Sequence, residues 1–166
     1  MVKIKYLSIG VLIIIIGIVI TVVLLPSEEK KVKKQFNLLS GYATKSPEES
    51  GFTLLQKMKN IGSLFDEQCE LKAPSQSLSG NYKREEISSY AGSARSYFSQ
   101  LDLRFYDFNI VFSEKGVARV TLTSRLTGKS VAGEQVDETR ELECVLKKIE
   151  GKWLFSQIEV VEVLKK

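Results

Sequence analysis

Histidine is missing from this 166-residue sequence, and proline, cysteine and tryptophan are scarce, with 3, 2 and 1 copies. Because imidazole is a common ligand of zinc and of haem iron, its absence excludes the usual forms of both sites. It also excludes Ser-His and Cys-His nucleophile pairs. The sequence contains neither a glycine-rich phosphate loop nor a Cys-x-x-Cys pair. It therefore predicts no metal, no cofactor, and no hydrolytic or redox activity.

The two cysteines, Cys69 and Cys144, permit one disulfide at most. Free cysteines most often behave as small hydrophobic residues of a core, and we favour that interpretation. A Cys69–Cys144 disulfide is the alternative, and it requires the domain to lie in an oxidising compartment. Spacing in the sequence does not decide between the two, because it does not show whether the side chains meet.

Charge, proline, asparagine and glutamine are all absent from Leu7 to Leu25, a run of 19 residues of which 15 are Ile, Leu or Val. As a helix this run is about 28 Å long, close to the hydrocarbon thickness of a bilayer. A cleaved signal peptide has a shorter apolar region, and a lipid-modified N-terminus needs a following cysteine. A buried helix of a soluble core is the remaining alternative, but this run is apolar on all faces and lies where little chain is available to cover it. We therefore predict a leader at 1–6 and a transmembrane anchor at 7–25, with the lipid bilayer as a partner.

Two signals disagree about the side of the membrane on which the rest of the chain lies. Lys3 and Lys5 precede the anchor, whereas four of the residues from Lys30 to Lys34 are lysines, and the positive-inside rule places that flank in the cytoplasm. A short basic leader is, however, typical of a signal anchor that exports the following chain. We predict a single-pass protein of a bacterial inner membrane with an exported C-terminal domain, and a lysine flank that contacts lipid headgroups.

The remainder of the chain, about 140 residues, is long enough for one domain. The net charge is +4, of which Lys3 and Lys5 supply two, and the basic residues are interleaved with acidic ones. Such a distribution excludes the basic surface of a nucleic-acid-binding protein. One charged cluster is either a solvated face or a partner surface on the open face of a sheet, where two copies could pair: Glu134, Asp137, Glu138, Arg140, Glu141 and Glu143.

Apolar residues recur at helical spacing in three segments. The first predicted helix covers residues 28–42, within a juxtamembrane segment at 26–45. The second begins at Ser46-Pro47, an N-cap followed by proline. The third opens at Arg84, is followed by acidic residues that suit a helix start, and continues to Leu101. The second helix should bury one stripe, which consists of Phe52, Leu55, Met58, Ile61 and Phe65.

Beyond Leu103 the apolar period changes to two, which predicts four long strands in an antiparallel meander. On the first strand Tyr106 and Phe108 should share a face, and on the last Leu154 and Ile158 should do so. Two short strands, 69–72 and 76–82, come before the third helix. The strands of the meander should be joined by short turns. These turns are expected at Ser113–Gly116, Thr127–Lys129 and Glu150–Gly151.

Helices first and a meander last predict an α+β domain with helices on one face of a curved sheet. Two motifs add a resemblance to a known family. The run from Gly80 to Ile87 is similar to the Gly-x-x-x-Arg-Glu-x-Ile motif that opens the long helix of the nuclear transport factor 2-like superfamily. Glu150-Gly151 followed by Trp153 is similar to its last hairpin. Residues 30–164 thus resemble this cone-shaped fold, which implies three helices on a curved, mainly antiparallel sheet.

The superfamily includes ketosteroid isomerases, SnoaL-like cyclases and scaffolds, so the fold alone does not imply an activity. Its isomerases hold an Asp base and a Tyr donor in the mouth of the cone, and this resemblance makes Asp107 the candidate catalytic residue. Adjacent strand positions face opposite sides, so Tyr106 and Asp107 cannot line one pocket. Asp107 is more typical of a strand edge or a bulge than of a base.

We therefore predict a membrane-tethered module that binds a protein or a small apolar ligand, or that acts in assembly. One alternative is a small pocket enzyme of the isomerase or dehydratase type that uses a carboxylate in the cone. Another is a scaffold subunit of an envelope transport or secretion complex, because an anchor followed by a cone resembles the bitopic scaffold subunits of type IV secretion systems.

Overall fold

The computed structural model describes residues 27–74 and 78–161. The chain divides into two compact units, residues 1–31 and 32–166. In the first unit, residues 27–31 begin a helix, and Ser27 Oγ accepts a hydrogen bond from the backbone N–H of Lys30. The predicted leader and anchor, 1–6 and 7–25, lie outside the described residues. No helix within the described ranges is long and apolar enough to span a membrane.

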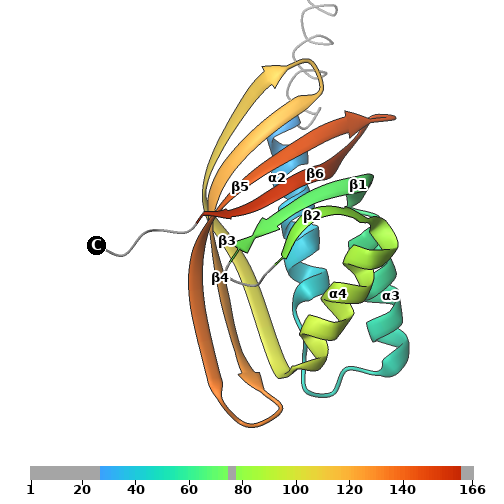
Figure 1. Ribbon diagram of the computed structural model, residues 1–166, viewed down its shortest axis with the longest axis vertical. Helices are drawn as coiled ribbons and strands as arrows, with labels where there is room; N and C mark the ends of the chain where they lie inside the picture. Colours follow the sequence, from blue (N-terminus) through green and yellow to red (C-terminus); the bar gives the residue numbers. More distant parts are fainter. Residues whose placement is uncertain (1–26, 75–77, 162–166) are drawn as a thin grey trace, which may run out of the picture. The chain divides into compact units, whose positions relative to one another are not determined.

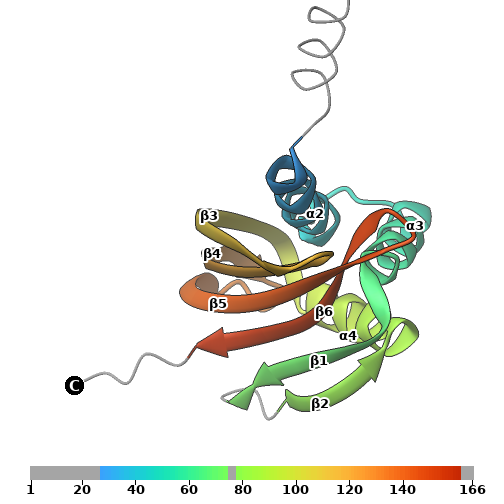
Figure 2. The same ribbon diagram turned by 90° about the horizontal axis from the view of Figure 1, so that it is seen from above.

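Three helices cover one face of a six-stranded sheet in the described part of the chain (Figure 1). Neighbouring strands are antiparallel except β1 and β6, which are parallel. Figure 2 shows that the sheet is strongly curved and that α2 lies across its hollow side. This arrangement confirms the predicted α+β architecture. The helices are α2 (Glu28–Ala43), α3 (Gly51–Gly62) and α4 (Arg84–Ser96), and the strands are β1 (Phe65–Ala73), β2 (Leu78–Lys83), β3 (Phe98–Glu114), β4 (Val117–Ser130), β5 (Gln135–Ile149) and β6 (Lys152–Val161), in the spatial order β2-β1-β6-β5-β4-β3.

Helix α2 packs on the sheet through Val32 and Phe36, which lie one turn apart and are fully buried. The ring of Phe36 contacts Phe105, Phe108 and Phe155 edge to face, with centroid distances of 5.4, 5.3 and 4.9 Å. Edge-to-face packing is favourable for aromatic rings because their edges and faces carry opposite partial charge. This aromatic cluster forms the centre of the core beneath α2.

Strands β4 and β5 follow the predicted period of two. Ala118, Val120 and Leu122 are buried on the helix side of β4. On β5, Leu142 lies opposite Leu122 and Cys144 lies opposite Val120, so both strands contribute to one apolar surface. The intervening residues face the opposite side, which we call the outer face of the sheet.

The alternation on β6 differs from the prediction because of a β-bulge. Phe155 and Gln157 of β6 pair with two consecutive residues of β5, Leu146 and Val145. Ser156, which lies between them, is therefore the extra residue. The core residues of β6 are therefore Trp153 and Phe155, which precede the bulge, and Ile158, which follows it. Leu154, which we expected on the face of Ile158, points to the other side.

The predicted turn at Thr127–Lys129 is wrong, because β4 continues through it to Ser130 and the turn follows at residues 131–134. Gly128 allows β4 to pack closely against β3 here. A Cβ atom at this position would lie 2.5 Å from the carbonyl oxygen of Gln100 on β3. The other two turns are as predicted, and Glu150 and Gly151 have φ of 49° and 80°, as a two-residue hairpin requires.

Two helix boundaries also differ from the prediction. Helix α3 begins after Ser50, whose Oγ accepts a hydrogen bond from Thr53 N at 3.2 Å, and not after Ser46. Helix α4 ends at Ser96, because the chain from Phe98 pairs with β4. The expectation that Phe65 continues the apolar stripe of α3 is wrong, because the helix ends at Gly62 and Phe65 begins β1. The stripe itself is only half buried. Met58 and Ile61 lie in the core, whereas Phe52 and Leu55 are 78% and 71% exposed.

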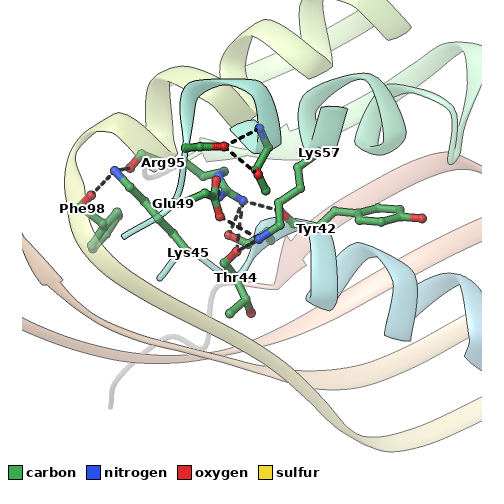
Figure 3. A network of polar contacts seen from close by, with 10 residues as sticks. Tyr42, Thr44, Lys45, Glu49, Lys57, Arg95 and Phe98 are labelled. Carbon is green, nitrogen blue, oxygen red and sulfur yellow. Dashed lines mark hydrogen bonds and ion pairs between the residues drawn. The ribbon is translucent and has the colours of Figure 1, made fainter. Parts of the chain in front are cut away.

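A buried arginine connects the end of α2 to α4 (Figure 3). Arg95 on α4 is 2% exposed, and its Nη2 donates to Glu49 Oε1 at 2.5 Å. Its Nη1 donates to the carbonyl oxygens of Tyr42, Ala43 and Thr44. These carbonyls belong to the end of α2 and the residue after it, where a helix leaves backbone acceptors unpaired. Arg95 on α4 therefore supplies the hydrogen-bond donors that these carbonyl oxygens lack within α2.

Two lysines extend this network. Lys57 on α3 donates to Glu49 Oε2 at 2.7 Å, and Lys45 donates to the carbonyl oxygen of Arg95 at 3.1 Å. Burial of Glu49 raises its pKa, but the charges and hydrogen bonds of Lys57 and Arg95 outweigh this effect and hold the pKa below its ordinary value. Because Glu49 is held in this way, residues 46–50 form a loop and not the predicted first turn of a helix.

We expect Glu49→Gln to lower the free energy of unfolding by about 3 kcal/mol, because it leaves Arg95 and Lys57 without their buried anion. Urea unfolding followed by circular dichroism measures this change. Glu48→Gln is the matched control, since this neighbouring carboxylate is exposed, and it should have little effect. Equal effects of the two substitutions would contradict the role of the network.

This difference in stability should depend on pH. The pKa of Glu49 is lowered in the folded protein, so its charge stabilises the fold above the unfolded pKa, roughly 4.3, and the contribution is lost as the pH falls through the folded pKa. The gap between wild type and Glu49→Gln should therefore narrow below pH about 4. A gap that persists unchanged in acid would show that the charge of Glu49 is not its cause.

Candidate functional site

Asp107, the candidate base, lies in a bulge of β3. The pairing of β3 with β4 passes from Tyr106–Thr123 to Asn109–Thr121, which leaves one residue extra, and Asp107 has φ of 54°. Aspartate adopts this left-handed conformation more readily than most residues. The side chain of Asp107 is exposed. The expectation of a bulge residue is thus confirmed.

The same bulge changes which neighbours of Asp107 face the core. Phe105 and Phe108, three positions apart, both pack against it. Tyr106 lies on the outer face and is 41% exposed, so the expectation that it shares a face with Phe108 is wrong. The structure therefore does not bring Asp107 and Tyr106 together in the cone.

The interior of the cone is apolar in the part of the chain that the structure describes. Its buried polar or charged residues are Arg95, Ser124 and Ser130, and none of them is a carboxylic acid. The most enclosed carboxylate of the ion pairs, Glu49, is held by two cations outside the aromatic cluster. No group of three potential metal ligands occurs among the described residues. The core accordingly offers packing groups and no acid–base pair.

Cys69 and Cys144 are free thiols and both are buried. They belong to β1 and β5, and β6 lies between these strands, so their backbones are about 9–10 Å apart. A disulfide requires that the Cα atoms of its two cysteines lie no more than about 7 Å apart. Burial, with Asp66 and Glu70 nearby, raises the pKa of Cys69 to about 12, and burial likewise raises the pKa of Cys144. Both therefore act as small core residues.

The six charged residues predicted to form one surface are all exposed, but they do not share a face. Alternate positions of β5 point to opposite sides, and Arg140 pairs with Ser124, which is buried on the helix side. Glu138 and Arg140 thus lie on the helix side, beyond the packed core, and Glu134 lies in the turn before β5. The residues on the outer face are Asp137, Glu141 and Glu143.

The part of the outer face formed by β3 and β4 is basic, and we call it the basic half. Arg104 and Arg125 lie directly opposite each other on the two strands and are 65% and 51% exposed. A hollow of about 250 Å³ lies between them and is also lined by Tyr106. The basic residues of this half are Arg104, Arg119, Arg125 and Lys129, and its acids are Asp102 and Glu114.

The part formed by β5, β6 and β1 is acidic, and we call it the acidic half. Glu143 and Glu159 lie directly opposite each other, and Lys72 Nζ reaches Glu159 at 3.8 Å and Glu70 at 3.1 Å. Like charges placed opposite each other are unfavourable on a sheet. The acids of this half are Asp137, Glu141, Glu143, Glu159 and Glu70, with the bases Lys72, Lys147 and Lys152.

The two halves meet at one ion pair between β4 and β5. Arg125 donates to Asp137 through Nε at 3.0 Å and Nη2 at 2.7 Å. Sequence reasoning missed this division of charge, although the period of two assigns most of these residues to the same side of their strands. The register that places Arg104 beside Arg125 could not be read from the sequence, since the bulge and the late turn both change it.

Neither family models nor curated protein sequences match this chain. Solved structures do match it. A putative scytalone dehydratase from Novosphingobium aromaticivorans has a TM-score of 0.66 and 16% identity, covering 82% of this chain and 85% of its own. A putative calcium/calmodulin dependent protein kinase II association domain from Xanthomonas campestris has a TM-score of 0.64 and 14% identity, covering 83% and 89%. LinA has a TM-score of 0.66 and 12% identity, covering 81% and 85%.

At these identities the similarity is one of fold. The names of the three proteins range from a dehydratase to an association domain, so the shared fold does not indicate one activity for this chain. The three helices and the curved sheet agree with them. The domain has the nuclear transport factor 2-like fold.

Proposed function

We propose that this chain is a membrane-tethered binding or assembly module that works through the outer face of its sheet. The observation that carries the proposal is the contrast between the two faces. Phe36 and its three aromatic partners occupy the helix side, whereas the outer face exposes opposite charges in two separate halves. The anchor at 7–25 would hold the module at the membrane, with the domain on the exported side.

A second copy of the chain is the partner that this charge pattern suits. In a two-fold symmetric dimer, one patch meets the same patch of its partner, so a surface divided into opposite halves is complementary to itself. The basic half of one copy would lie on the acidic half of the other, which would give Glu143 and Glu159 cationic partners. The similarity in fold to an association domain is consistent with such a role.

A small pocket enzyme is the second candidate, because the fold is also similar to that of a putative dehydratase and of LinA. Asp107 would be its base. The exposure of this residue and its place in a bulge weigh against that role, since a general base must lie within hydrogen-bond reach of a bound substrate.

The tether predicts how the full chain fractionates. Carbonate washing should leave it in the membrane pellet, detergent should release it, and deletion of 7–25 should move it to the soluble fraction. An alkaline phosphatase fused after Lys166 should be active, because the fusion would be exported. Recovery of the intact full chain in the carbonate wash would overturn the tether, and an inactive fusion would place the domain in the cytoplasm.

Asp107→Asn tests the enzyme candidate. Asparagine keeps the size of the side chain and adopts positive φ readily, but it cannot accept a proton as a carboxylate does. We expect the variant to fold normally and to restore function in a strain that lacks the gene. Loss of function with unchanged abundance and thermal stability would favour the small pocket enzyme over the binding module.

Self-association should depend on the two halves of the outer face. We expect Glu141→Lys with Glu143→Lys to weaken the dimer of the full chain in mild detergent by tenfold or more, as measured by sedimentation. Adding Arg119→Glu and Arg125→Glu should restore it, because the exchanged charges are again complementary.

Glu138→Lys is the matched control for this exchange, since Glu138 is exposed on the same strand but lies on the helix side. It should leave the dimer unchanged. A monomeric wild-type chain at all concentrations would refute self-association, and failure of the double exchange to restore the dimer would refute the pairing of the two halves.

A further inference from the structure

Two hairpin turns meet at one end of the sheet. The first joins β3 to β4 and the second joins β5 to β6. The backbone N–H of Lys148 donates to the carbonyl oxygen of Gly116 at 2.8 Å, which holds the end of β5 beside the first turn. We call this region the hairpin end. Its exposed residues include Val111, Phe112, Lys115, Lys147, Ile149 and Lys152.

The hairpin end combines exposed apolar side chains with basic ones. Val111, Phe112 and Ile149 are 52%, 44% and 37% exposed, and the ring of Phe112 packs on Trp153 with a centroid distance of 5.8 Å. Lysines at 115, 147, 148 and 152 outnumber the acids Glu114 and Glu150. Apolar side chains surrounded by lysines are typical of surfaces that enter the headgroup region of a bilayer.

The other end of the strands has no such excess of basic residues. The turn between β4 and β5 is followed or flanked by Glu134, Asp137 and Glu138, and the nearby bases are Lys129, Arg125, which pairs with Asp137, and Arg140, which pairs with Glu138. The 14 residues of β4 separate the two ends by about 45 Å. An anionic surface would therefore attract the hairpin end more strongly than the far end.

Helix α2 relates the hairpin end to the predicted anchor. α2 runs antiparallel to β3, since Lys45 pairs with Leu101 and Lys33 Nζ lies 5.8 Å from the ring centroid of Phe108. From Phe108, β3 continues six residues to Glu114, about 20 Å further, in the direction in which α2 runs back toward Val32.

The connection to the anchor is short. Leu25, the last residue of the predicted span, precedes Val32, the first residue of the second unit, by seven positions, which reach about 25 Å at most. The length of the connection thus keeps Val32 within about 25 Å of the bilayer surface. The hairpin end, which lies in the direction in which α2 runs back toward Val32, is within reach of the headgroups.

We propose that the hairpin end docks on the surface of a bilayer that contains anionic lipids, with its lysines at the lipid phosphates and Val111, Phe112 and Ile149 at the boundary of the acyl region. This inference rests on the proposed tether and adds a second, lipid-dependent contact to it. It fixes the direction of the domain on the membrane, with the strands pointing toward the bilayer and the far end away from it.

Fluorescence quenching in vesicles tests this contact with the full chain. A fluorophore is attached at Lys115→Cys or, as a matched control at the far end, at Ala132→Cys, while the native cysteines stay buried. The vesicles contain phosphatidylcholine alone or with phosphatidylglycerol, plus a lipid with a nitroxide on its headgroup. We expect severalfold stronger quenching at position 115 than at 132, and only when phosphatidylglycerol is present.

Lys147→Glu and Lys152→Glu should each lower the ratio of docked to undocked chain about fivefold. Val111→Ser, which removes an exposed apolar side chain and no charge, should lower it too. Lys129→Glu at the far end should leave it unchanged. Thermal unfolding of each variant confirms that it is folded.

The outcomes separate this inference from the tether. A chain that dissociates from the vesicles on washing refutes the tether. A chain that stays bound, but shows equal quenching at 115 and 132 or no response to phosphatidylglycerol, overturns docking of the hairpin end and leaves the tether intact. Protection of position 115 from an aqueous quencher without quenching by lipid would mean that protein covers this end, and would also overturn the proposal.

Discussion

The contact between Arg95 and Glu49 is the constraint on which the arrangement of the three helices depends. Burial of both charges is costly, and the cost is offset only if each hydrogen-bonding group finds a partner. Arg95 meets most of this condition, because its Nη1 and Nη2 bind the end of α2 and the loop before α3 at once, and only its Nε is buried without a hydrogen-bond partner. Lys57 brings α3 itself to Glu49. The helices thereby become one layer, and α2 is held where Phe36 can close the hollow of the sheet.

The sequence predicted the layers better than the details within them. β4 and β5 carry an unbroken period of two, so their buried residues followed from the pattern. The bulge at Ser156 could not be predicted, because an extra residue on one strand is defined only by its pairing with the next. The end of α4 was misplaced for the same reason, since pairing with β4 overrides a helical pattern from Phe98 onward.

For the candidate sites, too, the sequence was sufficient for some residues and not for others. The sequence was sufficient to class Asp107 as a bulge residue and to exclude any site that needs histidine. It was not sufficient to place Arg95, which sits in an apolar helical stripe and whose partner Glu49 lies 46 positions away. The charge division of the outer face also needed the register of the strands, because only the register shows that Arg104 and Arg125 are neighbours while Glu143 adjoins Glu159.

The two proposed contacts constrain each other. If the hairpin end faces the bilayer, the strands point toward the membrane and the outer face stands roughly perpendicular to it. Two tethered copies can then meet face to face only about a two-fold axis that is parallel to the strands. This axis exchanges the two sides of the sheet, so it places the basic half of each copy on the acidic half of the other. A two-fold axis perpendicular to the strands would place like charges opposite each other and would move one hairpin end away from the membrane. The single arrangement that keeps both copies docked is therefore also the one that the charges of the outer face favour.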